Sequence, residues 1–360
     1  MSFYLQYLVI ATLSAFLLAG CARTPAIKTG ADHTATNRPF RFTVKADQDT
    51  VLTLKLVSPD LYDARLPDEE EAKYHVSYDL DCDNDGTYEK TAQTGDAVCE
   101  LQRGTHQIAI RGTAPGFIFP GAFLYSDETR AIQNDAVSAL HAISLDQWGD
   151  IPWRNISRLF GCPDISLPPG KGRPIYRAQD APTLRYVRSL ECAASYAAYE
   201  SDLSTWDVSH ITNMQFAFLR ATTFNQDLST WNTGRVTTMA DMFEGAYLFD
   251  QPIGRWNTSR VTDMSYMFNG ATSFDHDLSA WNTENVTDMS GMFSGAHRFN
   301  QDISRWNTSR VTSMRRMFAF ADAFDQDISS WNTENVTDFE GMFSNTSFDI
   351  SKAPKNYIMP

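Results

Sequence analysis

The chain has 360 residues, with a hydrophobic content of 42% and a charged content of 21%. These values exclude a wholly disordered chain, because they allow a substantial apolar core. The formal net charge is −14. It disfavours nucleic acids and anionic lipid surfaces as partners, since both are also negatively charged.

The N-terminal segment predicts export. Leu8 to Ala19 is an apolar stretch of 12 residues, which is too short to cross a bilayer, and Gly20 and Cys21 follow it. The sequence Leu18-Ala19-Gly20-Cys21 resembles the lipobox of bacterial lipoproteins, which implies cleavage before Cys21 and acylation of its thiol. The first 20 residues would then be a lipoprotein signal peptide, although they lack the usual Lys or Arg. The alternative is an ordinary signal peptide with an incidental cysteine.

A separate module is expected between this segment and the C-terminal half. Residues 21–39 are rich in Thr, Ala, Pro and Gly, which predicts a flexible tether. Within residues 40–115, polar and apolar residues alternate as in β-strands, and the expected strands are 40–44, 51–57, 74–80 and 105–110. We expect a small β-sandwich there. It resembles an immunoglobulin-like domain of the PKD type, and this resemblance implies a spacing role.

One acidic motif in this module indicates metal binding. Carboxylates occupy alternate positions at Asp79, Asp81, Asp83 and Asp85, and Gly86 follows, as at the start of an EF-hand calcium loop. The twelfth position of such a loop is Ala92 instead of glutamate, and no flanking helices are expected. An acidic hairpin turn without metal is therefore the alternative to a structural calcium site. We expect no other cofactor.

The remaining cysteines predict disulfides. Four are left once Cys21 is assigned to the lipid, and an exported chain can oxidise them in pairs. Of three connectivities, proximity favours Cys82 with Cys99, as a hairpin staple, and Cys162 with Cys192. A metal site is a weaker interpretation, because no Cys-x-x-Cys pair or nearby His completes a ligand set.

The C-terminal half is an internal repeat. Six tryptophans follow one another at steps of 25 residues, and most of the residues between them recur at the same step. One such coil cannot enclose its own apolar side chains, so it must lie against its neighbours, about 4.8 Å apart if they pair as strands do. We expect regular repeats over 201–350, two divergent repeats forming a cap over 140–200, and a tail over 351–360.

The pattern of residues within each repeat predicts one helix and one strand. Val286, Met289, Met292, Phe293 and Ala296 follow spacings of three and four, the pattern of a short helix. The segment 301–306 is the candidate strand. The expected fold is therefore an α/β solenoid of the leucine-rich-repeat kind.

These repeats also carry a family resemblance. The pattern Val-Thr-x-Met-x-x-Met-Phe-x-x-Ala-x-x-Phe-Asn-Gln-Asp-Ile-Ser-x-Trp-Asn-Thr recurs nearly intact from Val236, Val261, Val286 and Val311. It resembles the BspA-like leucine-rich-repeat surface proteins, also described as the mycoplasma-lipoprotein repeat family. This resemblance implies adhesion to host matrix proteins or to other bacteria for some relatives.

Polar and aromatic side chains form rows along the repeats. Asp202, Asp227, Asp277, Asp302 and Asp327 share one position, and we expect them to cap turns, with a ligand or cation row as the alternative. The tryptophans are expected to stack in the core, with a carbohydrate-binding stripe as the alternative. Arginine and glutamate alternate with a two-coil period after the Asn-Thr pairs, which suggests duplication of a two-coil unit.

The sequence predicts a binding protein and not an enzyme. It contains no His-Glu-x-x-His, Gly-x-Ser-x-Gly or phosphate-loop motif. We expect a lipoprotein of the bacterial cell envelope, at the outer membrane or cell surface. Its lipid would anchor it in the membrane, and its partner would be a protein ligand. Specificity is expected where the repeats differ, at Tyr247, His297, Arg298, Arg315 and Arg316. The alternative is a structural envelope protein that associates with itself through an open C-terminal end.

Overall fold

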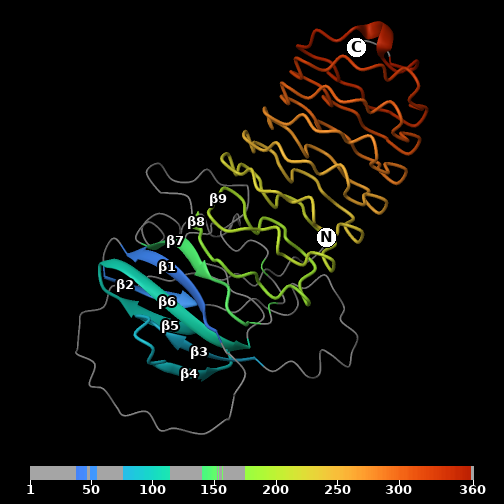
Figure 1. Cartoon of the computed structure of the whole chain (residues 1–360). Helices are drawn as coiled ribbons and strands as arrows, with labels where there is room; N and C mark the ends of the chain where they lie inside the picture. Colours follow the sequence, from blue (N-terminus) through green and yellow to red (C-terminus); the bar gives the residue numbers. More distant parts are fainter. Residues whose placement is uncertain are drawn as a thin grey trace, which may run out of the picture.

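A computed structural model describes residues 38–46, 49–54, 76–113, 140–151, 153, 156 and 175–357. A group of β-strands occupies one end of the molecule, and a stack of coils extends from it, with the C-terminal coils farthest from the strands (Figure 1). Within this described part, no helix has the length and apolar character needed to span a membrane.

The N-terminal part contains two sheets, which we call the β module. Antiparallel strands β4, β3, β6, β1 and β7 lie side by side in the larger sheet, and β2 pairs with β5 in the smaller one. Alternate residues of β1, from Phe40 to Ala46, are buried, as expected for a strand that covers a core. The strands are β1 (Phe40–Ala46), β2 (Thr50–Leu54), β3 (Ser77–Asp81), β4 (Lys90–Gln93), β5 (Ala97–Leu101), β6 (Gly104–Thr113) and β7 (Leu140–Gln147).

Both sheets contribute to one apolar core. Leu52 of β2 and Leu101 of β5 belong to the same buried cluster as Phe42 of β1 and Ile110 of β6. A disulfide joins Cys82, directly after β3, to Cys99 in β5. It therefore links the two sheets, where the sequence predicted a staple within one hairpin.

The larger sheet continues into the repeats. β7 pairs with β1 on one side and, in parallel, with β8 (Ile175–Tyr176) on the other, and β8 pairs with β9 (Ala198–Tyr199). The core is continuous as well, because the ring of Trp148 meets that of Trp206 edge-on at 5.3 Å. The expected cap at 140–200 thus begins with β7, which is also part of the module's sheet.

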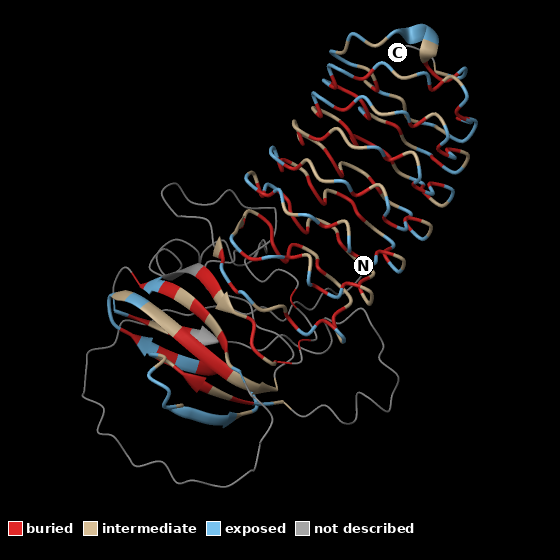
Figure 2. Cartoon of the chain, viewed as in Figure 1, coloured by how far each residue is buried: buried red, intermediate tan, exposed pale blue. Residues whose placement is uncertain are grey.

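The repeats form what we call the repeat stack, residues 189–357. Parallel bridges join equivalent residues of successive coils, from Ser189 and Asn213 up to Ser313 and Asp338. Phenylalanines of successive coils stack with ring centroids 5.6 to 5.8 Å apart, as from Phe268 through Phe293 to Phe318. Buried residues fill the inside of the coils, and exposed residues lie along their outer edges (Figure 2).

The short helix expected in each repeat is replaced by turns. In the segment 289–296, the N–H groups of Met289, Gly291, Phe293 and Gly295 donate to carbonyls of the next coil, and those of Met292, Ser294 and Ala296 donate three residues back. Because alternate N–H groups bond between coils, the i→i−4 bonds of an α-helix cannot form. The apolar spacing of three and four is therefore a property of successive turns.

The expected strand at 301–306 is also absent. Ser304 N–H donates to the carboxylate of Asp302, and Trp306 N–H donates to the carbonyl of Ile303, so this segment is a turn. The bridge between coils lies at Asp288 instead, within the segment that resembled a helix. The described residues contain one helix, the 3₁₀ turn η3 (Ile350–Lys352).

The polar rows hold the coils together. The carboxylate of each turn-capping aspartate, such as Asp227, accepts the N–H two residues later, and these hydrogen bonds hold the pKa of the carboxyl below its usual value. In the neighbouring row, Asn225 accepts the N–H of Asp250 in the next coil at 2.9 Å. The expected capping role is therefore confirmed.

The tryptophans belong to the core. The six tryptophans of the repeats are 3% to 5% exposed, and the indole N–H of Trp281 donates to the carbonyl of Ile253, 28 residues earlier. Neighbouring rings stack, as between Trp281 and Trp306 at 6.4 Å. Because these rings are covered, their faces are closed to carbohydrate.

Candidate functional site

Each regular coil contains two residues in the left-handed region of backbone conformation, four positions apart. We call these positions the first and second left-handed rows. Their φ values lie between +51° and +69°. The first row is Phe216, Asp241, Tyr266, Gly291, Arg316 and Gly341, and the second is Arg220, Gly245, Gly270, Gly295, Phe320 and Asn345.

The residue type in these rows varies from coil to coil, although glycine alone would satisfy the backbone conformation. Glycine adopts a positive φ without strain, whereas a bulky side chain there costs of the order of 1–3 kcal/mol. The second row has glycine in three consecutive coils, so glycine is sufficient for the turn. Where Phe320 or Arg220 stands instead, the side chain must contribute something that offsets its strain.

Two of the bulky side chains pack along the stack. A Cβ at Gly291 would lie 2.4 Å from the ring of Tyr266, and one at Gly341 would lie 3.4 Å from the side chain of Arg316. Tyr266 and Arg316 therefore cover glycine positions of the next coil. Because Phe216 and Tyr266 alternate with smaller residues, the first row follows the two-coil period expected from the sequence.

Phe320 does not follow this pattern. Half of it is exposed, and Asn345 occupies the equivalent position in the next coil. Gly245, Gly270 and Gly295 precede it in the same row, so three successive coils present backbone without a side chain. Phe320 was not among the predicted binding residues, although its departure from glycine at this repeat position is visible in the sequence.

Aromatic and apolar side chains lie beside this glycine strip. Tyr247 is 51% exposed and Leu248 is 53% exposed. The Tyr247 ring approaches the strip, since a Cβ at Gly270 would lie 3.9 Å from its Cε1. Five large hydrophobic residues are exposed in the described part, and Tyr247, Leu248 and Phe320 are three of them. Phe320 occupies the same row as the three glycines of the strip. We call Phe320, Tyr247, Leu248 and the three glycines the exposed patch.

The predicted charged residues are partly engaged within the stack. Arg315 Nη2 donates to Glu340 Oε1 at 2.9 Å, and this partner raises the pKa of its guanidinium. His297 Nδ1 lies 2.9 Å from Asp322 Oδ2, and both side chains are about half-exposed or more. Arg298 and Arg316 are exposed. Of the five predicted binding residues, Tyr247 thus joins the exposed patch, whereas Arg315 forms an ion pair with the next coil and His297 contacts Asp322 of the next coil.

The first left-handed row also holds a perturbed carboxyl. Burial, together with the neighbouring carboxylates of Glu244 and Asp263, raises the pKa of Asp241 to about 8. Gln215 acts in the opposite direction through a hydrogen bond. Asp241 therefore keeps its proton at neutral pH.

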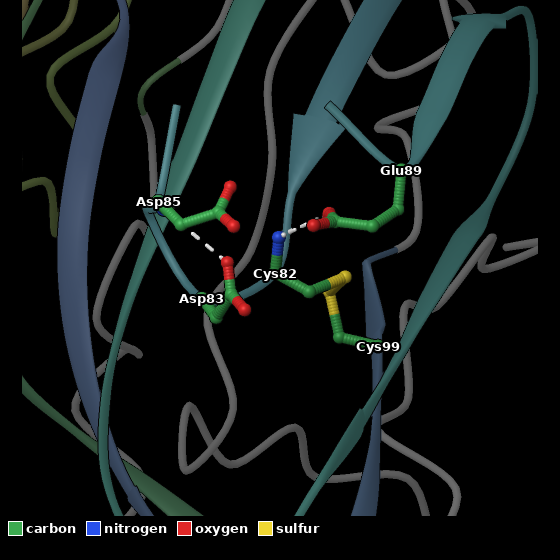
Figure 3. Close-up of a disulfide and its surroundings, with 5 residues drawn as sticks. All are labelled: Cys82, Asp83, Asp85, Glu89 and Cys99. Carbon is green, nitrogen blue, oxygen red and sulfur yellow. Dashed lines mark hydrogen bonds between the residues drawn. A yellow bond between two sulfur atoms is a disulfide. The ribbon is translucent and has the colours of Figure 1, made fainter. Parts of the chain in front are cut away.

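The acidic motif forms a different cluster from the one predicted. One carboxylate oxygen each from Asp81, Asp83, Asp85 and Glu89 lies within 4.8 Å of the others. Asp79 is instead paired with Arg111 of β6, with 3.0 Å between Oδ2 and Nε. Figure 3 shows Asp83, Asp85 and Glu89 beside the disulfide of Cys82 and Cys99.

Other predicted sites lie at or beyond the edge of the described residues. Cys21, the expected site of lipidation, is outside them, and so is Cys162. Cys192 is buried and disulfide-bonded. Its pairing with Cys162 stays a prediction.

Comparison with known families identifies one match, and it falls on the repeats. Residues 189–286 and 276–354 match the model of a family described as "Mycoplasma protein of unknown function, DUF285". The repeats are similar to this mycoplasma family. Its two matches cover the repeat stack from the first bridge at Ser189 almost to the end of the described coils, and they do not include the β module. No curated protein and no solved structure matches the chain.

Proposed function

We propose that the chain is a surface-anchored bacterial lipoprotein whose repeat stack, a solenoid of the BspA-like leucine-rich-repeat kind, binds a protein ligand. The exposed patch carries this proposal. Aromatic residues are enriched at the centres of protein interfaces, where they provide much of the binding energy. Phe320 is exposed and also occupies a strained position that glycine fills in three other coils.

The distribution of conserved and variable positions along the stack supports a binding role. Stacked Phe and Trp rings inside the coils recur unchanged, so they maintain the fold. The left-handed rows and the turn after them differ from coil to coil on the outside. Repeat scaffolds present such outer surfaces to large partners, because the invariant part holds the variable side chains in fixed positions.

Membrane attachment through Cys21 is the second part of the proposal. It rests on the sequence Leu18-Ala19-Gly20-Cys21, and the expected acylation would hold the protein at the outer membrane or cell surface. Protease treatment of intact cells should release fragments of the repeat stack. Fragments that appear only after the cells are broken would contradict surface exposure.

Self-association through an open C-terminal end is less well supported. The tail returns over the last coil, where the ring of Tyr357 meets those of Phe339 and Phe343 edge-on at 5.6 and 5.2 Å. Ile328 N–H donates to the carbonyl of Lys352, which joins the tail to the preceding coil. The tail thus covers part of the face to which another copy would have to add.

Affinity capture with matched variants tests the binding proposal. The full chain is immobilised, and proteins captured from surfaces of host cells and of other bacteria are compared between the wild type and Phe320→Gly/Tyr247→Thr. Both substitutions introduce residues that other coils carry at these positions, namely Gly295 and Thr272. We expect the variant to lose the ligand, whereas Arg305→Ser, which follows Ser330, should retain it. Equal capture by all three proteins would contradict the proposal.

A further inference from the structure

We propose that Asp81, Asp83, Asp85 and Glu89 of the β module bind one calcium ion. This site is separate from the exposed patch and does not depend on its function. The four carboxylates converge from the end of β3, the loop after it and the residue before β4. Their ligand atoms all lie within 4.8 Å of one another, although they come from a stretch of nine residues.

The buried carboxylate of Asp81 gives independent support. Asp81 is 1% exposed, and its Oδ1 has no hydrogen-bond partner. Its other oxygen, Oδ2, accepts the N–H of Gly86 at 3.0 Å. A buried carboxylate oxygen without a partner is costly, because it has lost its hydration without compensation. A cation held among the four carboxylates supplies that compensation.

Among the described residues, no positively charged side chain is paired with this cluster. None of the four carboxylates forms an ion pair with a described residue, and the nearby Arg111 is paired with Asp79. The Nε of Arg41 donates to the amide oxygen of Asn84, at 3.0 Å, instead of to a carboxylate. Four like charges at this separation repel strongly unless a counter-ion lies among them.

Local hydrogen bonds hold the carboxylates in place without using all of their oxygens. Asp83 Oδ1 accepts the N–H of Asp85 at 3.2 Å, and Asp85 Oδ1 accepts that of Thr87 at 2.7 Å. Glu89 Oε2 accepts the N–H of Cys82 at 2.9 Å, which brings the glutamate back to the start of the loop. The loop is therefore closed on itself before any ion binds, and the second oxygens stay available.

The geometry fits calcium better than magnesium or zinc. Calcium takes six to eight oxygen ligands at about 2.3–2.6 Å, so ligands on opposite sides of the ion lie up to about 5 Å apart. That matches the 4.8 Å limit of this cluster. Magnesium holds its ligands at about 2.0–2.1 Å, and zinc prefers nitrogen and sulfur. The neighbouring sulfur of Cys82 is fixed in a disulfide.

The proposed ligand set differs from the EF-hand pattern at one residue. In that pattern a glutamate at the twelfth position completes the site, whereas this chain has Ala92 there. Here Glu89, at the ninth position, takes part instead. Asp79 is excluded because it already binds Arg111 and accepts the N–H of Ala92 at 2.9 Å.

Calcium binding by the full chain tests this proposal. After treatment with EDTA, equilibrium dialysis against radioactive calcium should give one bound ion per chain, with a Kd of about 10⁻⁴–10⁻³ M, as in extracellular calcium modules. An equal concentration of magnesium should not displace it. If no calcium binds at concentrations up to about 10⁻² M, ten times the highest expected Kd, the proposal is overturned.

Two variants, each of which removes one negative charge, distinguish this ligand set from the one that the sequence pattern predicted. Glu89→Gln should weaken calcium binding at least about tenfold, and Asp79→Asn should change the Kd less than about threefold. Circular dichroism of both variants checks that they are folded. If Asp79→Asn abolishes binding and Glu89→Gln does not, the ligand assignment is wrong.

Discussion

The β module and the repeat stack are stabilised by contacts of different range. In the module, β1 pairs with β7, about 100 residues further along the chain, and a disulfide ties the two sheets. In the stack, nearly every bond between coils joins residues 24 to 28 positions apart. The stack therefore repeats one local solution, whereas the module depends on particular distant pairs.

This difference determines where function can be recognised. Because the coils repeat, the residues that the fold requires can be separated from those that it merely tolerates. Phe320 stands out because three other coils have glycine at its position. The module has no internal repeat to compare with, so the members of its acidic cluster are identified from geometry.

Removal of a buried ring from an interior coil should have the greatest effect, because neighbouring coils contact that ring from both sides. Phe293→Ala removes a fully buried ring that stacks on Phe268 and Phe318, and we expect it to lower the free energy of unfolding by about 3–5 kcal/mol. Phe343→Ala in the last coil should cost less, because Phe343 is only partly buried. Urea denaturation followed by far-ultraviolet circular dichroism compares the two. Equal losses would contradict a stack of nearest-neighbour contacts.

A second prediction concerns the coupling between the two regions. Replacing both Cys82 and Cys99 by serine should destabilise the β module by about 2–4 kcal/mol, because the unfolded chain loses a cross-link. Calorimetry should show a lower transition temperature for the module and a smaller shift for the stack. An equal shift in both would mean that the shared sheet through β7, β8 and β9 makes them one cooperative unit.

The raised pKa of Asp241 predicts a pH effect within the stack. Its folded-state pKa is about 8 against an ordinary 3.8, so the folded protein binds this proton more tightly than the unfolded one. The resulting stability is complete below pH 3.8 and is lost as the pH rises through about 8. The difference between these two pKa values corresponds to about 5–6 kcal/mol at most, and solvent screening of this partly exposed group reduces it. We therefore expect Asp241→Asn to raise the free energy of unfolding at pH 8 by about 1–3 kcal/mol and to leave it nearly unchanged at pH 4.

Asp227→Asn is the matched control for this measurement. Hydrogen bonds from Ser229 lower the pKa of Asp227, so its contribution to stability is present above pH 3.8 and is lost on acidification. The substitution should therefore give no gain at pH 8. A similar gain in both variants would point to net charge as the cause, and not to the buried carboxyl of Asp241.

The smallest effect on stability is expected at Phe320. Phe320→Gly removes backbone strain but also a half-buried ring, so the free energy of unfolding should change by no more than about 1 kcal/mol. Thermal denaturation measures this change. A loss of several kcal/mol would show that the ring serves the fold, and its strained position would then need no ligand to explain it.

The sequence predicted the repeat, the stacking of coils and the burial of the tryptophans, because each follows from a period of 25 residues. It did not predict the local structure of a coil. Met289, Met292 and Phe293 fit the spacing of a helix, but their apolar pattern also fits successive turns with left-handed residues at Gly291 and Gly295. A left-handed backbone conformation can be predicted from a sequence where the residue is glycine. It cannot be predicted at Phe320 and Arg316, because these residue types rarely adopt it.

The acidic site was predicted in its position but not in its ligands. Asp79 and Asp81 share a face of β3, so sequence spacing groups them. The register of the sheet, however, places Arg111 of β6 opposite Asp79 and removes it from the cluster. Glu89 enters because the chain turns back after Asp81, which spacing along a strand cannot show.

Photocrosslinking at the exposed patch tests whether a protein ligand binds there. The full chain is produced with a benzophenone amino acid in place of Phe320 and, separately, in place of the exposed Arg305. Intact cells are then irradiated in the presence of candidate partner cells. A bound protein should crosslink at position 320 and not at position 305. Equal crosslinking at the two positions, or none at 320 while the stack is folded and exposed at the surface, would contradict the account.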